Sequence, residues 1–271
     1  RFEVSSDRNF KRAIIQCLAA NPSDRFSIIM LYRDYSRGFT SFHGYGPGSS
    51  TSNEKGILGS FTLEAASHLF ISGGVDFIKY PWLRYRTSFP SASKRSELRI
   101  RFEPDEKVNL DFSVYTRSYM LNDDEKTGVP SIKINRYIQV KSLFRFSPND
   151  NLTLSSRVLY KRFMNSQNEG YLFSQDAVYN LKAIPLSIWL RYCLFNTSSW
   201  DSRLYLFEND LLYSFSVPAL SGEGTRSYIM LKYEFKKIAE CRIKYSFTST
   251  NLKNSHPEYN DELKLQIRFW F

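Results

Sequence analysis

The chain has 271 residues, a hydrophobic content of 42% and a formal net charge of +10. This length suits one β-barrel or about two soluble domains. No stretch approaches the roughly 18 consecutive apolar residues of a transmembrane helix, which excludes that class of membrane protein. A transmembrane β-barrel needs no such run, because only every second residue of a strand meets lipid.

Along the chain, strand, turn, strand and long loop follow one another repeatedly, and we expect about 14–16 strands. Short turns rich in Pro, Asp, Asn and Ser are expected at 21–24, 67–68, 104–106 and 147–150. Long loops are expected at 36–55, 80–96 and 122–135. Since membrane barrels have short periplasmic turns and long outer loops, the alternation favours an all-β fold, a transmembrane antiparallel up-and-down β-barrel.

The last strand alternates strictly. One face carries Leu263, Leu265, Ile267, Phe269 and Phe271, and the other carries Lys264, Gln266, Arg268 and Trp270. A half-buried edge strand of a soluble sheet also alternates. However, the chain stops on an aromatic residue, and in this the strand resembles the C-terminal assembly signal of bacterial outer-membrane barrels.

The position of this last strand sets the expected strand count. If it ends at the periplasm, the long loops lie outside only when the stretch 203–217 is split into two strands, 203–207 and 211–217. Glu208, Asn209 and Asp210 would then form the turn. The first clear strand, 13–20, would begin on the outer side, so at least one strand is missing before residue 11, or residues 1–10 supply part of it. We therefore expect residues 1–271 to be one outer-membrane β-barrel, the C-terminal portion of a longer protein and incomplete at its N-terminus.

Three sequence motifs are more specific than the alternating pattern that any β-barrel shares. They are Tyr-Arg-Asp-Tyr-Ser-Arg-Gly-Phe at 32–39 with Asn-Glu-Lys-Gly at 53–56, Phe-Ile-Lys-Tyr-Pro-Trp-Leu-Arg-Tyr at 77–85, and the stretch 208–218 with Gly-Glu-Gly at 222–224. Together they resemble the C-terminal β-barrel region of helix-hairpin-helix-containing outer-membrane proteins of the Bacteroidota type. The resemblance implies a barrel in the cell outer membrane. It implies no activity, and the helix-hairpin-helix repeats that precede the barrel in that family are not in this sequence.

Five residues near the expected outer rim are candidate contacts to a partner protein or an anionic ligand: Arg33, Arg37, Trp82, Arg84 and Arg86. Arg33 and Arg37 flank Asp34, which would place both signs of charge together. Guanidinium groups stack on aromatic rings, so Arg84 and Arg86 would suit a loop folded over the lumen. The alternative is that these residues only pack the loops.

The sequence offers few candidate catalytic residues. A lipase-like site needs a nucleophile and a base within hydrogen-bond reach, and Ser41 with His43 is the nearest pair. No glycine-rich phosphate loop and no metal-ligand spacing is present, and the three cysteines have no metal-type spacing. We expect no enzymatic activity, no cofactor and no metal.

The basic charge predicts contact with lipopolysaccharide, anionic lipid or an acidic protein. We do not expect nucleic acid as a partner, because Lys and Arg are spread along the strands instead of forming one patch. The expected function is a scaffold or accessory subunit of a larger envelope complex for protein biogenesis, secretion or uptake. Two alternatives remain: a channel for small or anionic solutes through a basic lumen, and a soluble β-protein that binds an acidic ligand.

Overall fold

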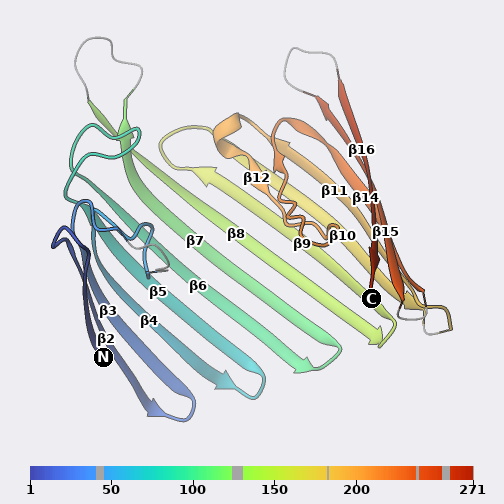
Figure 1. Cartoon of the computed structure of the whole chain (residues 1–271), viewed down its shortest axis with the longest axis horizontal. Coiled ribbons are helices and arrows are strands. Elements are labelled where there is room, and N and C mark those ends of the chain that lie inside the picture. Colours follow the sequence, from blue (N-terminus) through green and yellow to red (C-terminus); the bar gives the residue numbers. More distant parts are fainter. Residues whose placement is uncertain (41–45, 124–130, 182, 236–237, 252–256, 271) are drawn as a thin grey trace. The chain divides into compact units, whose positions relative to one another are not determined.

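A computed structural model describes residues 1–40, 46–123, 131–181, 183–235, 238–251 and 257–270. They form an all-β fold in which 14 strands make one antiparallel sheet, in the order β1 to β11, β14, β15 and β16 (Figure 1). The up-and-down topology and the expected count of about 14–16 strands are confirmed. No helix in the described ranges is long and apolar enough to cross a membrane.

The strands of the main sheet are β1 (Phe2–Ser6), β2 (Arg12–Ser23), β3 (Phe26–Tyr35), β4 (Glu54–Ala66), β5 (Leu69–Tyr80), β6 (Ser91–Asp105), β7 (Val108–Asn122), β8 (Ile132–Asn149), β9 (Leu152–Phe163), β10 (Glu169–Leu181), β11 (Leu186–Thr197), β14 (Glu223–Phe235), β15 (Ala239–Asn251) and β16 (Glu258–Phe269). A short 3-10 helix, η1 (Trp200–Ser202), and a two-stranded pair, β12 (Leu204–Tyr205) and β13 (Ala219–Leu220), lie between β11 and β14.

The contacts divide the chain into two compact units. Unit 1 comprises Arg1–Ile100 and Ser113–Ile138, and unit 2 comprises Arg101–Phe112 and Gln139–Phe271. The strands β6, β7 and β8 contribute residues to both units. Each unit is therefore described by itself.

In unit 2 the strands have one apolar and one polar face. Leu190 of β11 pairs with Ile229 of β14, and these side chains are 45% and 39% exposed. One residue further along, Arg191 pairs with Tyr228, and both are 4% exposed. Because successive side chains of a strand point to opposite faces, the exposed face is apolar and the covered face is polar. We call them the outer face and the inner face.

Unit 1 repeats this arrangement. Ile57 pairs with Phe77 across β4 and β5, and these side chains are more than half exposed. Gly56 pairs with Ile78 on the opposite face, where Arg33 lies in register with Gly56 and is buried. The inner face of unit 1 thus holds a buried charge while its outer face presents hydrophobic side chains.

The first residues supply a strand. Residues 2–6 form β1 and pair antiparallel with β2, from Phe2 opposite Gln16 to Ser6 opposite Arg12. The expectation that residues 1–10 supply part of a strand is confirmed.

The stretch 203–217 does not form two strands of the main sheet, so this prediction is wrong. Strand β11 pairs directly with β14, with Asn196 opposite Glu223. The expected turn at Glu208-Asn209-Asp210 lies in a segment that folds over the inner face of unit 2. Whether the stretch 203–217 adds two strands or none, every other turn and loop stays on the same side of the sheet. The positions of the turns and loops therefore could not distinguish two strands from none.

The strands extend further than the hydrophobic pattern predicted. Strand β6 begins at Ser91, so the loop expected at 80–96 is reduced to 81–90. Strand β2 continues to Ser23, with a register shift between Ala20 and Ser23, through the turn expected at 21–24. The strand ends are polar, yet their backbones keep pairing, because strand pairing uses main-chain groups and not side-chain hydrophobicity.

Candidate functional site

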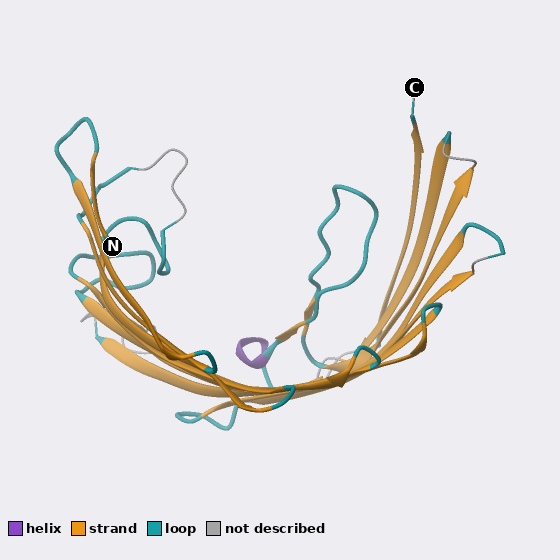
Figure 2. Cartoon of the chain, turned by 90° about the horizontal axis from the view of Figure 1, so that it is seen from below, coloured by secondary structure: helices purple, strands orange, loops and turns teal. Residues whose placement is uncertain are grey.

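The candidate site is the segment 198–222 of unit 2, which we call the inner segment. It contains η1, β12 and β13, and Figure 2 shows this short helix and the chain that follows it lying against one face of the strands. Its apolar side chains join a buried cluster with strand residues, and the cluster consists of Leu159, Leu172, Cys193, Phe195, Leu204, Leu206 and Leu220. Burial of these groups attaches the segment at its two ends.

Glu208 is the main polar attachment of the inner segment. Its carboxylate accepts hydrogen bonds from Arg226 Nε at 2.6 Å and Nη2 at 2.9 Å, and from Lys244 Nζ at 3.3 Å. Burial by itself would raise the pKa of Glu208, but the two cations lower the pKa below its ordinary value. The group is therefore a carboxylate at neutral pH despite being 1% exposed.

Asp210 binds the terminal strand. It accepts a hydrogen bond from Lys264 Nζ at 3.0 Å and lies 3.7 Å from Lys244 Nζ. Burial raises the pKa of Asp210, while Lys264, the Leu211 amide and Lys244 together lower it below the ordinary value. Two residues along β16, Gln266 accepts from the Leu212 amide at 2.8 Å and donates to the Leu212 carbonyl at 3.2 Å.

A third contact comes from strands β10 and β11. Arg191 donates from Nε and Nη2 to Asp176 at 2.5 and 2.8 Å, and from Nη1 to the carbonyl of Phe207 at 2.5 Å. Arg157 also pairs with Asp176. The inner segment therefore binds side chains from β11, β14, β15 and β16, and each of the four cations among them is paired with a carboxylate.

The tip of the inner segment is aromatic and exposed. Tyr213 is 92% exposed with φ of 63°, and Phe215 is 81% exposed. The ring of Phe215 lies 5.9 Å from that of Phe207, which is also exposed. Buried ion pairs thus hold an aromatic surface away from the sheet, in a form suited to contact a ligand or another polypeptide.

Unit 1 has a comparable cluster around Arg33. The guanidinium donates to Glu54 Oε1 at 2.6 Å and to both oxygens of Asp76 at 2.9 and 3.0 Å. Glu54 also accepts from the amide and hydroxyl of Ser49, and that hydroxyl shares a hydrogen bond with Tyr80. The cluster thereby ties the loop after β3 to the inner face of unit 1.

Glycine makes room for this cluster at two positions. A Cβ at Gly56 would clash with the Cζ atom of Arg33, directly across the strand pair. Gly48 has φ of 133°, and a Cβ there would clash with the carboxylate of Glu54. Both positions therefore require the absence of a side chain.

The sequence-predicted rim residues separate into different environments. Arg33 and Asp34 do not form one charged patch, because they point to opposite faces: Arg33 is buried inside, and Asp34 pairs with Lys55 at 2.8 Å. That expectation is wrong. The predicted stacking of Arg84 on an aromatic ring is confirmed, with Arg84 Cζ 3.7 Å from the Tyr80 ring centroid. The ring of Trp82 is contacted by Arg37, at 3.9 Å from its centroid, which was not predicted.

The last strand keeps its predicted alternation. Leu263, Leu265, Ile267 and Phe269 are all more than half exposed on the outer face, while Lys264 and Gln266 bind the inner segment. Arg86 adopts φ of 59° in the loop before β6. Ser41, His43 and Phe271 lie outside the described residues.

The partners of Glu208 and Asp210 were missed from the sequence. Asp and Asn are also typical turn residues, so the stretch looked like a turn. One sequence pattern could have indicated these buried carboxylates. Cations recur at the inward positions of the last three strands, at Arg226, Lys244 and Lys264. Their number calls for compensating carboxylates nearby.

Comparison with known proteins supports the fold. A solved structure described as "Structure of the RagAB peptide importer in the 'closed-closed' state" matches 99% of this chain with 11% identity and a TM-score of 0.50. A second, "Structure of the RagAB peptide transporter", matches 98% of the chain with 10% identity and a TM-score of 0.42. The chain spans 45% of the length of each matched chain.

At this identity the first match shows a shared fold alone, that of an antiparallel β-barrel sheet. No protein-family model matches the chain, and no curated protein matches it. The resemblance to helix-hairpin-helix-containing outer-membrane proteins therefore stays a prediction.

Proposed function

We propose that this chain is an integral β-barrel protein of the cell outer membrane, without enzymatic activity. It would act as a scaffold or accessory subunit of a larger envelope complex for protein biogenesis, secretion or uptake. The observation that carries the proposal is the inverted pattern of the strands, with exposed hydrophobic rows outside and buried ion pairs inside. Lipid is the solvent that such an outer face requires.

Two matched substitutions test the membrane placement. Leu190 lies near the middle of β11 on the outer face, and Leu83 lies in the loop 81–90; they are 45% and 46% exposed. Arginine at a lipid-facing position near the bilayer midplane costs about 2–4 kcal/mol. We therefore expect Leu190→Arg to reduce folding into lipid vesicles strongly and Leu83→Arg to leave it almost unchanged. A soluble protein would tolerate both equally, and that result would refute the proposal.

The subunit role is supported by the exposed aromatic tip of the inner segment and by the exposed rim residues Arg37 and Trp82. Uptake among the proposed roles is supported by the first matched structure, which is described as the RagAB peptide importer. Purification in mild detergent should recover other envelope proteins bound to this chain. Recovery of the chain alone, folded and monodisperse, would count against this role.

The alternative is a channel for small or anionic solutes through a basic lumen. The net charge of +10 favours it. Against it, the inward cations Arg33, Arg191 and Arg226 are already paired with carboxylates. Conductance in a planar bilayer with anion selectivity would support the channel, whereas no conductance from inserted protein would support the subunit.

A further inference from the structure

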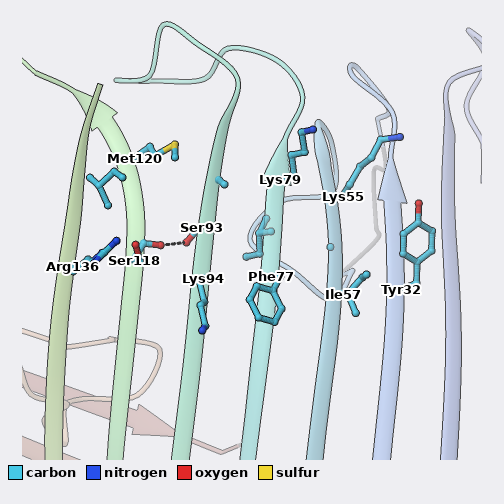
Figure 3. Close-up of a pocket in the computed structure, with 14 residues that line it drawn as sticks. Tyr32, Lys55, Ile57, Phe77, Lys79, Ser93, Lys94, Ser118, Met120 and Arg136 are labelled. Carbon is cyan, nitrogen blue, oxygen red and sulfur yellow. Dashed lines mark hydrogen bonds between the residues drawn. The ribbon is translucent and has the colours of Figure 1, made fainter. Parts of the chain in front are cut away.

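A groove of about 510 Å³ lies on the outer face of unit 1, near the ends of the strands that lead into the long loops. Its basic lining residues are Lys55, Lys79, Lys94 and Arg136, from β4, β5, β6 and β8, and no Asp or Glu lines it (Figure 3). Figure 3 shows Lys55 and Lys79 close to these strand ends. The groove is therefore a cationic site on a face that is otherwise hydrophobic.

Two cations of the groove, Lys79 and Arg136, lack an ion pair with the residues that the structure describes. Lys55 lies directly opposite Lys79 in the register of β4 and β5. Like charges placed opposite each other across a strand pair destabilise a sheet. Asp34 compensates Lys55 at 2.8 Å, but Lys79 and Arg136 have no ion pair with any residue that the structure describes. An external anion would remove this repulsion.

The floor of the groove is apolar. Tyr32, Ile57 and Phe77 form one row in register across β3, β4 and β5, and Ile57 and Phe77 are more than half exposed. This row lies two residues, about 7 Å, further from the loop ends than Lys55 and Lys79. The Lys94 ammonium lies 5.1 Å from the Phe77 ring centroid. Lys55 and Lys79 at the rim, with the hydrophobic row below them, match an amphiphile with an anionic head.

We propose that this groove binds the phosphorylated headgroup of a glycolipid of the outer leaflet, of the lipid A type. Lys79 of β5 and Arg136 of β8 are separated by β6 and β7, which is three strand spacings or about 14 Å, so each would bind a separate phosphate of the headgroup. Acyl chains would lie on Tyr32, Ile57 and Phe77. Inorganic phosphate or a soluble anion would leave the exposed hydrophobic row uncovered, so a lipid fits the groove better. The inference rests on the proposed membrane placement and adds a specific lipid site to it.

The test uses the refolded chain in detergent, with lipid retention measured by native mass spectrometry. The probes are lipid A, phosphatidylglycerol and phosphatidylethanolamine at equal concentration. We expect lipid A to be retained preferentially, and the double substitution Lys79→Ala with Arg136→Ala to weaken its retention about tenfold or more, because two charge-assisted contacts are lost. Both side chains lie on the surface, so the variant should fold.

The matched control is Lys141→Ala. Lys141 is exposed and lies on β8, five residues from Arg136, so it points to the opposite face of the same strand. We expect this variant to retain lipid A like the wild type. An equal loss in Lys141→Ala and in the double variant would overturn the proposal, since it would show only an effect of net charge.

The remaining outcomes also decide the question. Equal retention of phosphatidylglycerol and lipid A would overturn the assignment to a glycolipid. Heat-modifiable gel mobility and flotation with vesicles, measured in parallel, report membrane insertion. If the chain inserts but retains no lipid A, this inference fails and the proposed function stands. If it does not insert, both fail.

Discussion

Glu208 and Arg226 form a two-pronged ion pair in which Nε and Nη2 of the guanidinium lie 2.6 and 2.9 Å from the two carboxylate oxygens. Glu208 belongs to the inner segment and Arg226 to β14. Glu208 is buried and Arg226 is partly buried, with side-chain exposures of 1% and 14%. The pair therefore fixes the inner segment to the sheet, and its removal should loosen the whole segment.

We predict that Glu208→Gln releases the inner segment. A neutral amide leaves Arg226 without its carboxylate and Lys244 with Asp210 alone, and breaking a buried pair in this way costs about 3–5 kcal/mol. Hydrogen exchange of residues 204–220 should accelerate, while that of β9 and β10 stays slow. Asp201→Asn is the control, because Asp201 is an exposed carboxylate of the same segment. Unchanged exchange in Glu208→Gln would show that the apolar cluster alone holds the segment.

The same attachment should depend on pH. The pKa values of Glu208 and Asp210 are lowered in the folded state, so their stabilisation is fully present above the ordinary carboxyl pKa. It is lost as the pH falls below that value and through the lowered folded-state pKa. Protection factors of residues 204–220, which correct for intrinsic exchange rates, should therefore be constant near neutrality and fall in acid. A Glu208→Gln, Asp210→Asn variant should lose most of this pH dependence.

Arg33→Ala should destabilise unit 1 strongly. The substitution leaves Glu54, which is 0% exposed, without its cation and removes both hydrogen bonds to Asp76, at a cost of about 3–5 kcal/mol. The urea midpoint of the folded, heat-modifiable species measures the effect. Arg37→Ala is the control, since an exposed cation–π contact such as that with Trp82 contributes about 0.5–1 kcal/mol. Similar midpoints for the two variants would contradict the structural role of Arg33.

Gly56→Ala should also destabilise unit 1. The new methyl group would overlap the Arg33 guanidinium, which cannot retreat because Glu54 and Asp76 hold it, and overpacking of this kind costs about 1–3 kcal/mol. Gly59→Ala on the same strand is the control, because nothing lies within 4 Å of a Cβ there. Gly59→Ala should be neutral or slightly stabilising. The order of the two urea midpoints decides the prediction.

The fold was largely predictable because a strand in this protein alternates hydrophobic and polar residues. The turn at Ser67 and His68 and the exposed row from Leu263 to Phe269 follow from that local pattern. Strand ends were less predictable, since polar residues there keep pairing through their backbones. Because Arg33 and Asp34 are adjacent in the sequence, we expected their charges to lie together, but the two side chains lie on opposite faces.

The candidate site was not predictable in the same way. The partners of Glu208 and Asp210 lie on β14, β15 and β16, and Lys264 is 54 residues from Asp210. An Asn-Asp pair has the same local preference whether it closes a turn or fills a buried ion-pair cluster. Only the three-dimensional arrangement distinguishes these two uses.

The inner segment leaves the sheet after Thr197 and returns beside the point where it left, since Asn196 pairs with Glu223. Its length therefore does not affect the register of any strand, and doubling it would cost only about 0.6 kcal/mol in loop-closure entropy. Natural selection can thus exchange or lengthen this segment while the sheet stays the same. Related barrels could acquire different ligands or partners through this one replaceable part.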